Sequence, residues 1–189
     1  MIRAGDTLAN EITGETIHFI ETAADTNGEY TLIEVTLEAG GGVPMAHVHP
    51  YQSETFEILE GELSMRAGRD KLVAYAGDVV SVPPGQRHKF WNASGRAVRF
   101  RCTVAPALQF ERFIETMFAL AADGKLNKRG MPSPLRLAPI ALTYFDDVRA
   151  AVIPSWLQKA GLVPGGAIAR TLGYGAPPVE HTELVPASA

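Results

Sequence analysis

The segment GGVPMAHVHPYQSETFEILEG, residues 41–61, carries the strongest structural signal in the chain. His47 and His49 lie two positions apart in a short run that is typical of a β-strand. Successive side chains of a strand point to opposite faces, so we expect these two imidazoles to point to the same side. Glu54 begins the next expected strand, directly after a turn-like stretch, and its carboxylate can reach the same point in space. This one segment therefore predicts a chelating group of two histidines and a glutamate.

A second segment, GDVVSVPPGQRHKFWN at residues 77–92, contributes a further imidazole. His88 follows the Pro-Pro-Gly turn, which cannot continue a central strand, and its own strand could close back on the first pair. Three imidazoles and one carboxylate suit a divalent transition metal: Fe(II), Mn(II), Ni(II), Co(II), Cu(II) or Zn(II). An octahedral metal with four protein ligands keeps two open positions, enough for a substrate and for water or dioxygen.

Together the two segments resemble the cupin superfamily. Its first motif, G-x5-H-x-H-x4-E-x6-G, is matched by Gly41, His47, His49, Glu54 and Gly61. Its second motif, G-x5-P-x-G-x2-H-x3-N, is matched by Gly77, Pro83, Gly85, His88 and Asn92. The resemblance implies a jelly-roll β-barrel that binds a metal inside through His47, His49, Glu54 and His88, and it implies a homodimer paired through edge strands. The stretch HVHPYQSETFEILEGEL is also similar to single-domain bacterial cupins related to quercetin dioxygenases.

The first hundred residues have the pattern of an all-β domain, because Gly and Pro separate short runs rich in Val, Ile, Thr, Phe and Tyr. Nine short strands of this kind predict a sandwich or a barrel. The expected strands are 15–22, 30–38, 45–49, 54–60, 62–67, 71–75, 78–82, 87–92 and 97–104.

The pattern changes after Val104. Apolar residues recur with a 3.6-residue period over 108–121, and a second helix is expected to begin at Ser133 and to continue to about Val148. Shorter helical pieces are expected at 155–160 and 167–172. The predicted organisation is therefore a cupin barrel over residues 1–105 and a helical C-terminal extension over residues 106–189.

The apolar faces of the extension need burial, and two arrangements remain open. In the first, the helices pack against the outside of the barrel or against a partner subunit. In the second, they form a lid over the mouth of the barrel, in which case Trp156 or Tyr144 would contact the pocket.

Composition excludes several classes of protein. The 189 residues have a net charge of −4 and no basic block, which disfavours a nucleic-acid partner. Cys102 is the only cysteine, so no intramolecular disulfide can form, and a reducing compartment fits. The sequence has neither a signal-peptide pattern nor an apolar run of roughly 18 residues, so we expect a cytoplasmic protein without a membrane span.

Strand alternation predicts which side chains share the interior with the metal ligands. Met45, Phe56 and Phe90 have the inward parity and are expected to line a substrate pocket. Gln52 is the polar residue expected to orient a substrate group. The same alternation favours a filling role in the core for Ile58, an exposed face for Arg99 and Arg101, and a core position for Cys102.

These observations predict a metal-dependent enzyme, a dioxygenase-like oxidoreductase acting on a small enolisable or phenolic molecule. Metal binding lowers the pKa of a substrate hydroxyl, and the electron-rich enolate can then react with dioxygen. Glu54 could combine the role of ligand with that of proton acceptor, with Gln52 nearby. Two alternatives stay open: a non-catalytic cupin that binds or senses a small molecule, and an isomerase, lyase or hydrolase that uses the metal as a Lewis acid.

Overall fold

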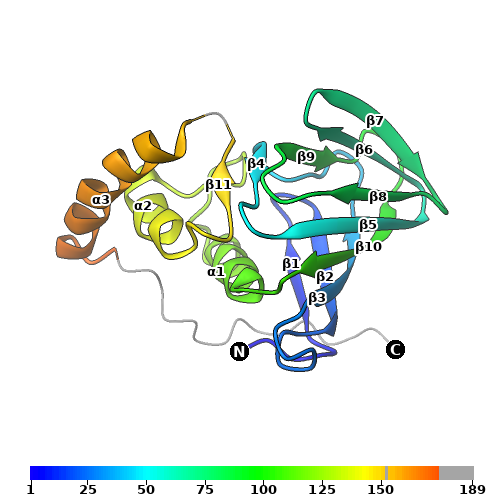
Figure 1. The fold of residues 1–189 in the computed structure, drawn as a ribbon, viewed down its shortest axis with the longest axis horizontal. Coiled ribbons are helices and arrows are strands. Elements are labelled where there is room, and N and C mark those ends of the chain that lie inside the picture. Colours follow the sequence, from blue (N-terminus) through cyan, green and yellow to red (C-terminus); the bar gives the residue numbers. More distant parts are fainter. Residues whose placement is uncertain (152, 175–189) are drawn as a thin grey trace.

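The structure is a computed structural model that describes residues 1–151 and 153–174. Two antiparallel sheets face each other and curl into a barrel (Figure 1). One sheet has the order β1 (Thr7–Asn10), β2 (Glu15–Glu21), β3 (Thr31–Leu37), β10 (Val98–Ala105), β5 (Ser53–Glu60) and β8 (Val79–Val82). The other has the order β11 (Arg149–Ala150), β4 (His47–Val48), β9 (His88–Trp91), β6 (Glu62–Ala67) and β7 (Asp70–Tyr75).

The nine strands expected from the sequence correspond to β2 through β10, with ends that differ by no more than two residues. Two strands were not expected. β1 is only four residues long, and it pairs with β2 at the edge of the larger sheet. β11 is two residues long and belongs to the C-terminal extension, but it pairs with β4 and so extends the sheet that carries His47.

The core lies between the two sheets, because each strand turns one face inward. β3 shows this most clearly, since buried and partly buried residues alternate along its whole length. Three phenylalanines join the sheets: Phe90 from β9 lies 5.6 Å from Phe56 and 5.5 Å from Phe100, measured between ring centroids. Aromatic pairs at these distances stabilise a core beyond the effect of buried area alone.

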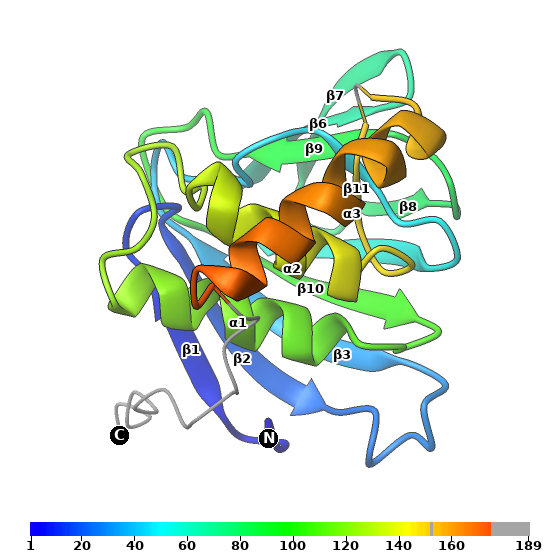
Figure 2. The same ribbon diagram turned by 90° about the vertical axis from the view of Figure 1, so that its left-hand side faces the viewer.

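Three helices follow the barrel: α1 (Phe110–Ala122), α2 (Pro134–Thr143) and α3 (Ser155–Thr171). Viewed from their side, they lie across the strands (Figure 2). Phe110 and Phe118 of α1 are buried in the same apolar cluster as the barrel strands, so α1 packs directly on the barrel. None of the helices in the described part of the chain is both long enough and apolar enough to cross a bilayer.

Two expectations about the helices were wrong. The second helix ends at Thr143, because the chain turns at Tyr144 and then forms β11 on the edge of the barrel. The two short pieces near the C-terminus form the single helix α3, although Pro164 and three glycines lower its intrinsic propensity. Packing on α2 explains why the helix continues. Gly166 is buried there, and a Cβ at this position would lie 2.5 Å from a methyl carbon of Leu142, so glycine permits the close approach.

Candidate metal centre

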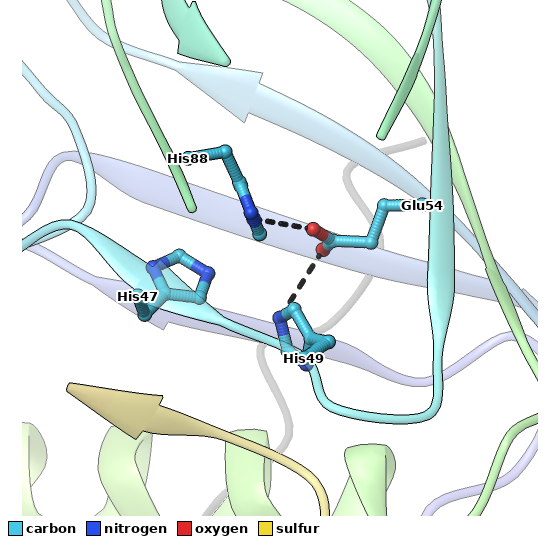
Figure 3. Close-up of side chains that lie close together, drawn as sticks. All are labelled: His47, His49, Glu54 and His88. Carbon is cyan, nitrogen blue, oxygen red and sulfur yellow. Dashed lines mark ion pairs between the residues drawn. The ribbon is translucent and has the colours of Figure 1, made fainter. Parts of the chain in front are cut away.

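Four side chains that are distant in the sequence converge inside the barrel. His47 lies in β4 opposite His88 of the paired strand β9, His49 follows directly after β4, and Glu54 reaches across from β5 of the other sheet. One potential ligand atom from each of the four lies within 4.8 Å of all the others. Figure 3 shows the carboxylate of Glu54 directed at the rings of His49 and His88, with His47 beside them. The cluster expected from the two sequence segments is therefore present and can bind a metal.

Each imidazole is held through its Nδ1 atom. The Nδ1 atoms of His47 and His88 lie 3.2 and 3.1 Å from main-chain carbonyl oxygens two residues earlier in the chain. His49 Nδ1 lies 2.6 Å from the carbonyl oxygen of Asp147. A carbonyl oxygen can only accept, so each Nδ1 carries the hydrogen and donates it. In the neutral ring Nε2 then holds the free lone pair, which is the state that a metal ligand requires.

The contacts between Glu54 and the imidazoles show that the donor set fits a cation. Glu54 Oε2 lies 2.5 Å from His88 Nε2, and Glu54 Oε1 lies 3.7 Å from His49 Nε2. Glu54 Oε2 and His88 Nε2 are both buried, the close contact between them lacks hydrogen-bond geometry, and no other described residue forms a hydrogen bond with either atom. Buried polar atoms without a partner are costly, and a bound metal ion would satisfy both.

The electrostatics of the cluster also suit a metal. Burial is the main cause that lowers the pKa of His47 to about 3, and the neighbouring imidazoles lower it further, so this ring is neutral at pH 7. Burial acts to raise the pKa of Glu54, but the surrounding histidines outweigh that effect and lower it to about 2. Burial acts to lower the pKa of His88, but its contact with the ionised Glu54 raises it overall. The site therefore offers an ionised carboxylate among imidazoles, as a divalent cation prefers.

A cavity of about 760 Å³ opens beside the cluster, and His47, His49 and Glu54 form part of its wall. Met45, Phe56 and Phe90, the residues expected to line a pocket, lie in the same wall. The helices of the extension form the opposite side, so they cover the barrel instead of packing only on its outer surface.

The expectation that Trp156 or Tyr144 would contact the pocket was wrong. Trp156 is 70% exposed and does not line the cavity. Tyr144 is buried, but its hydroxyl lies 3.0 Å from the hydroxyl of Thr116 and it too is outside the cavity wall. The sequence pattern could not show which aromatic residues of the extension face the cavity, because the placement of the helices over the barrel depends on contacts between residues far apart in the chain.

Gln52 lies behind His49 and away from the cavity wall. Its Nε2 atom donates to the carbonyl oxygens of Pro106 and Ala107, at 3.0 Å each, and its Oε1 atom lies 3.2 Å from His49 Nδ1. The side chain is 1% exposed and its amide is fully used within the protein. Its position therefore does not match the expected contact with substrate, and Gln52 instead helps to hold the ring of His49.

Four other residues are placed as strand alternation favoured. Ile58 is buried in the core and does not line the cavity. Arg99 and Arg101 lie on the outer face of β10, where both pair with Glu34, at 2.9 and 3.5 Å. Cys102 is buried and lines the cavity, and burial raises the pKa of its thiol well above the usual value.

Asp147 is a residue of the candidate site that the sequence did not reveal. Its carbonyl oxygen accepts the hydrogen bond from His49, and its side-chain Oδ1 atom accepts one from the backbone N–H of Gln109 at 2.7 Å, just before α1. The extension thus contacts a candidate metal ligand directly. No sequence signal could identify this role, because every residue has a carbonyl oxygen and these two residues are 98 positions apart.

Replacing Asp147 by alanine is expected to weaken both the fold and the metal site. The variant removes the acceptor of the Gln109 N–H, a partly buried hydrogen bond, which should lower the free energy of unfolding by about 0.5–1.5 kcal/mol. The variant keeps the main-chain carbonyl that accepts from His49, but the segment that carries this carbonyl loses its side-chain anchor to Gln109, so metal affinity should fall by up to about tenfold. Asp146→Ala is the matched control, since that side chain is 69% exposed and pairs with Arg149 on the surface. Urea unfolding and competitive Zn(II) titration should separate the two variants, and equal behaviour would contradict the assigned role.

Glu15 is a second unexpected feature of the cavity. It shares the inward parity of Ile17 on β2, and both residues line the cavity. Burial raises the pKa of its carboxyl to about 7. The unfolded chain ionises this group near its ordinary value of 4.5, while the folded protein retains the proton up to about 7. Glu15 therefore destabilises the fold increasingly as the pH rises from about 4.5 to 7.

Glu15→Gln is expected to remove this pH dependence. The shift corresponds to roughly 3 kcal/mol, so the fall in unfolding free energy between pH 5 and pH 8 should be smaller by about that amount in the variant. Urea unfolding of both proteins at the two pH values measures the difference directly. Glu11→Gln, at an exposed position before β2, should behave like the unmodified protein. An identical fall in all three proteins would show that Glu15 is not protonated in the folded state.

Comparison with known proteins agrees with this architecture. Residues 33–104 match the Cupin domain family. The chain is 28% identical over 107 residues to quercetin 2,3-dioxygenase of Bacillus subtilis, covering 56% of this chain and 31% of that protein. It is 28% identical over 121 residues to the probable oxidoreductase virH of Hypocrea virens, covering 60% of this chain and 53% of that protein.

Among solved structures, a predicted oxalate decarboxylase from Thermotoga maritima is 18% identical, with a TM-score of 0.49, and the match covers 56% of this chain and 98% of that chain. The chain spans less than two thirds of the length of the curated relatives that it matches. The family match covers β3 to β10 almost completely, and these strands carry all four residues of the metal cluster or lie next to them. The barrel of this chain is a cupin domain.

Proposed function

We propose that the protein is a metal-dependent, dioxygenase-like oxidoreductase that acts on a small enolisable or phenolic molecule. One observation carries the proposal: the group of three imidazoles and one carboxylate adjoins a cavity large enough for an organic substrate, with His47, His49 and Glu54 in its wall. His47, His49, Glu54 and His88 would hold the metal. Relatives named as a dioxygenase and as oxidoreductases support this class of reaction.

The residues of the site have distinct roles in this proposal. A bound divalent metal would lower the pKa of a substrate hydroxyl and so favour the electron-rich enolate or phenolate. Glu54 is ionised and lies in the cavity wall, so its carboxylate can accept the hydroxyl proton. Phe56 and Phe90 would hold the organic body of the substrate and exclude water from it. Dioxygen would be the second substrate.

Oxygen uptake tests the proposal. The purified protein, stripped of metal and reloaded separately with Fe(II), Mn(II), Ni(II), Co(II), Cu(II) or Zn(II), should consume oxygen with at least one phenolic or enolisable compound. Uptake should stop with a chelator and should be lost in His49→Ala but kept in Asp146→Ala. Turnover without oxygen uptake would favour Lewis-acid chemistry, and tight binding without turnover would favour a binding or sensory role.

We also propose that the protein acts as a homodimer in the cytoplasm, as the resemblance to cupins and the composition led us to expect. Strands β8 and β7 lie at edges of the two sheets. In the described part of the chain, each has one side without a neighbouring strand, where a second copy could pair. Analytical ultracentrifugation should give twice the mass of the 20.3 kDa chain. A single species with the mass of one chain would contradict the dimer.

A further inference from the structure

The cavity extends well beyond the barrel. Its inner part is lined by barrel residues around the metal cluster, and its outer part lies between the barrel and the three helices of the extension. Most of the residues that the helices contribute are apolar: Phe113, Ile114 and Met117 from α1, Leu137 and Ala141 from α2, and Leu162 from α3. The group of four candidate metal ligands therefore lies at one side of a much larger apolar chamber.

Few polar groups in this chamber are available to a ligand. Arg149 uses its Nε atom to donate to the carbonyl oxygen of Phe145 at 2.7 Å, and its guanidinium lies over the ring of the same residue at 4.1 Å. Gln158 donates to the carbonyl oxygens of Ala150 and Ile153. Apart from the candidate metal ligands, Glu15 is the remaining charged or amide side chain of the described lining, and it is buried with the Thr13 side chain as a hydrogen-bond partner.

The chamber has an apolar mouth at the beginning of α3. Ile153 and Leu157 line the cavity and are 44% and 47% exposed, so their side chains contact both the cavity and the solvent. Gly161, one turn later, also lines the cavity and is exposed. A molecule that enters here meets apolar side chains first and the metal cluster last.

From this arrangement, and on the premise of the proposed function, we infer that the substrate is a phenol or enol with a long apolar substituent. Its oxygen-bearing end binds at the metal cluster, and its apolar body extends between the barrel and the helices toward Gly161. A cavity of about 760 Å³ is in the range that binds a drug-sized molecule, so a single ring would leave most of it unfilled. The shortage of free polar groups in the lining selects against a charged or sugar-like body.

A series of 4-alkylcatechols tests the inference. Binding of 4-methylcatechol and 4-hexylcatechol to the Co(II)-loaded protein is measured by calorimetry, and the visible spectrum of Co(II) reports coordination. Each buried methylene should strengthen binding about three- to fourfold, so the hexyl compound should bind at least about 100-fold more tightly than the methyl compound. Affinities that differ less than fivefold would overturn the inference.

Variants of the helices show whether the alkyl chain occupies the proposed chamber. A Cβ at Gly161 meets no atom within 4 Å, so Gly161→Phe can be accommodated and should narrow the outer chamber. It should weaken binding of 4-hexylcatechol at least tenfold and leave 4-methylcatechol within twofold. Ala160→Phe is the matched control, because Ala160 is exposed and lies outside the cavity wall. Ala141→Phe fills the chamber from α2 and should act like Gly161→Phe.

The results separate this inference from the proposed function. Suppose that binding depends on the length of the alkyl substituent and is weakened by Gly161→Phe and Ala141→Phe, but that no metal gives oxygen uptake. This result would support the inference and contradict the dioxygenase. Oxygen uptake with both catechols at equal affinity would support the dioxygenase and overturn the inference. If Ala160→Phe and Gly161→Phe weakened binding of 4-hexylcatechol equally, the inference would also be overturned, since the alkyl substituent would then bind outside the chamber. No binding of either catechol would overturn it as well.

Discussion

Replacing Glu54 by alanine is expected to lower the affinity for a divalent metal by more than about 100-fold. Loss of a group that only orients a metal ligand already costs 10- to 100-fold, and Glu54 would be a ligand itself. It is also the sole carboxylate in the cluster, so the variant would keep three neutral donors and no negative charge. Competition between the protein and a chromophoric chelator, with Zn(II) or Co(II), measures the change.

Glu57→Ala is the matched control for this experiment. Glu57 lies on the same strand, β5, but it is exposed on the outer face. It removes the same charge and the same number of atoms without touching the cluster, so its metal affinity should stay within threefold of the original protein. If Glu54→Ala and Glu57→Ala bound metal equally well, Glu54 would not be a ligand.

Replacing Phe118 by alanine is expected to lower the free energy of unfolding by about 3–5 kcal/mol, the usual cost of removing a buried aromatic ring. Phe118 belongs to α1 but is only 3% exposed, because it is buried in the apolar cluster of the barrel. That loss is a large part of the 5–15 kcal/mol that stabilises a typical domain. Urea unfolding should therefore show a single transition at a much lower midpoint.

Trp156→Ala provides the contrast within the same extension. Its ring is larger than that of Phe118, but it is 70% exposed at the beginning of α3, so its removal should change the unfolding free energy by no more than about 0.5 kcal/mol. A Phe118→Ala protein whose barrel unfolds at the original midpoint would show that α1 and the barrel do not share a core. The barrel over residues 1–105 and the extension over residues 106–189 would then unfold independently of each other.

The metal cluster could be predicted from the sequence because its spacing is local. His47 and His49 obey the two-residue period of a strand, and strand ends predicted to within two residues were enough to give that parity. The placement of His88 opposite His47 depended on the resemblance to cupins, since nothing in the sequence alone specifies which strand closes on β4.

Features that depend on contacts between distant parts of the chain could not be predicted. The carbonyl of Asp147 that orients His49 has no sequence signal, and β11 is too short for an alternating pattern. The cover formed by the helices left only an ambiguous signal, because an amphipathic face shows that a helix is buried and not which surface buries it. For that reason the exposed Trp156 and the buried Phe118 could not be ranked in advance.

Anomalous diffraction from crystals of the protein loaded with Co(II) tests the central claim most directly. Data collected at the cobalt absorption edge locate the metal independently of any assumption about its ligands. We predict one strong peak inside the barrel, about 2.0–2.2 Å from an Nε2 atom of each of His47, His49 and His88 and from a carboxylate oxygen of Glu54. A peak outside this cluster, or no peak at full metal loading, would contradict the account.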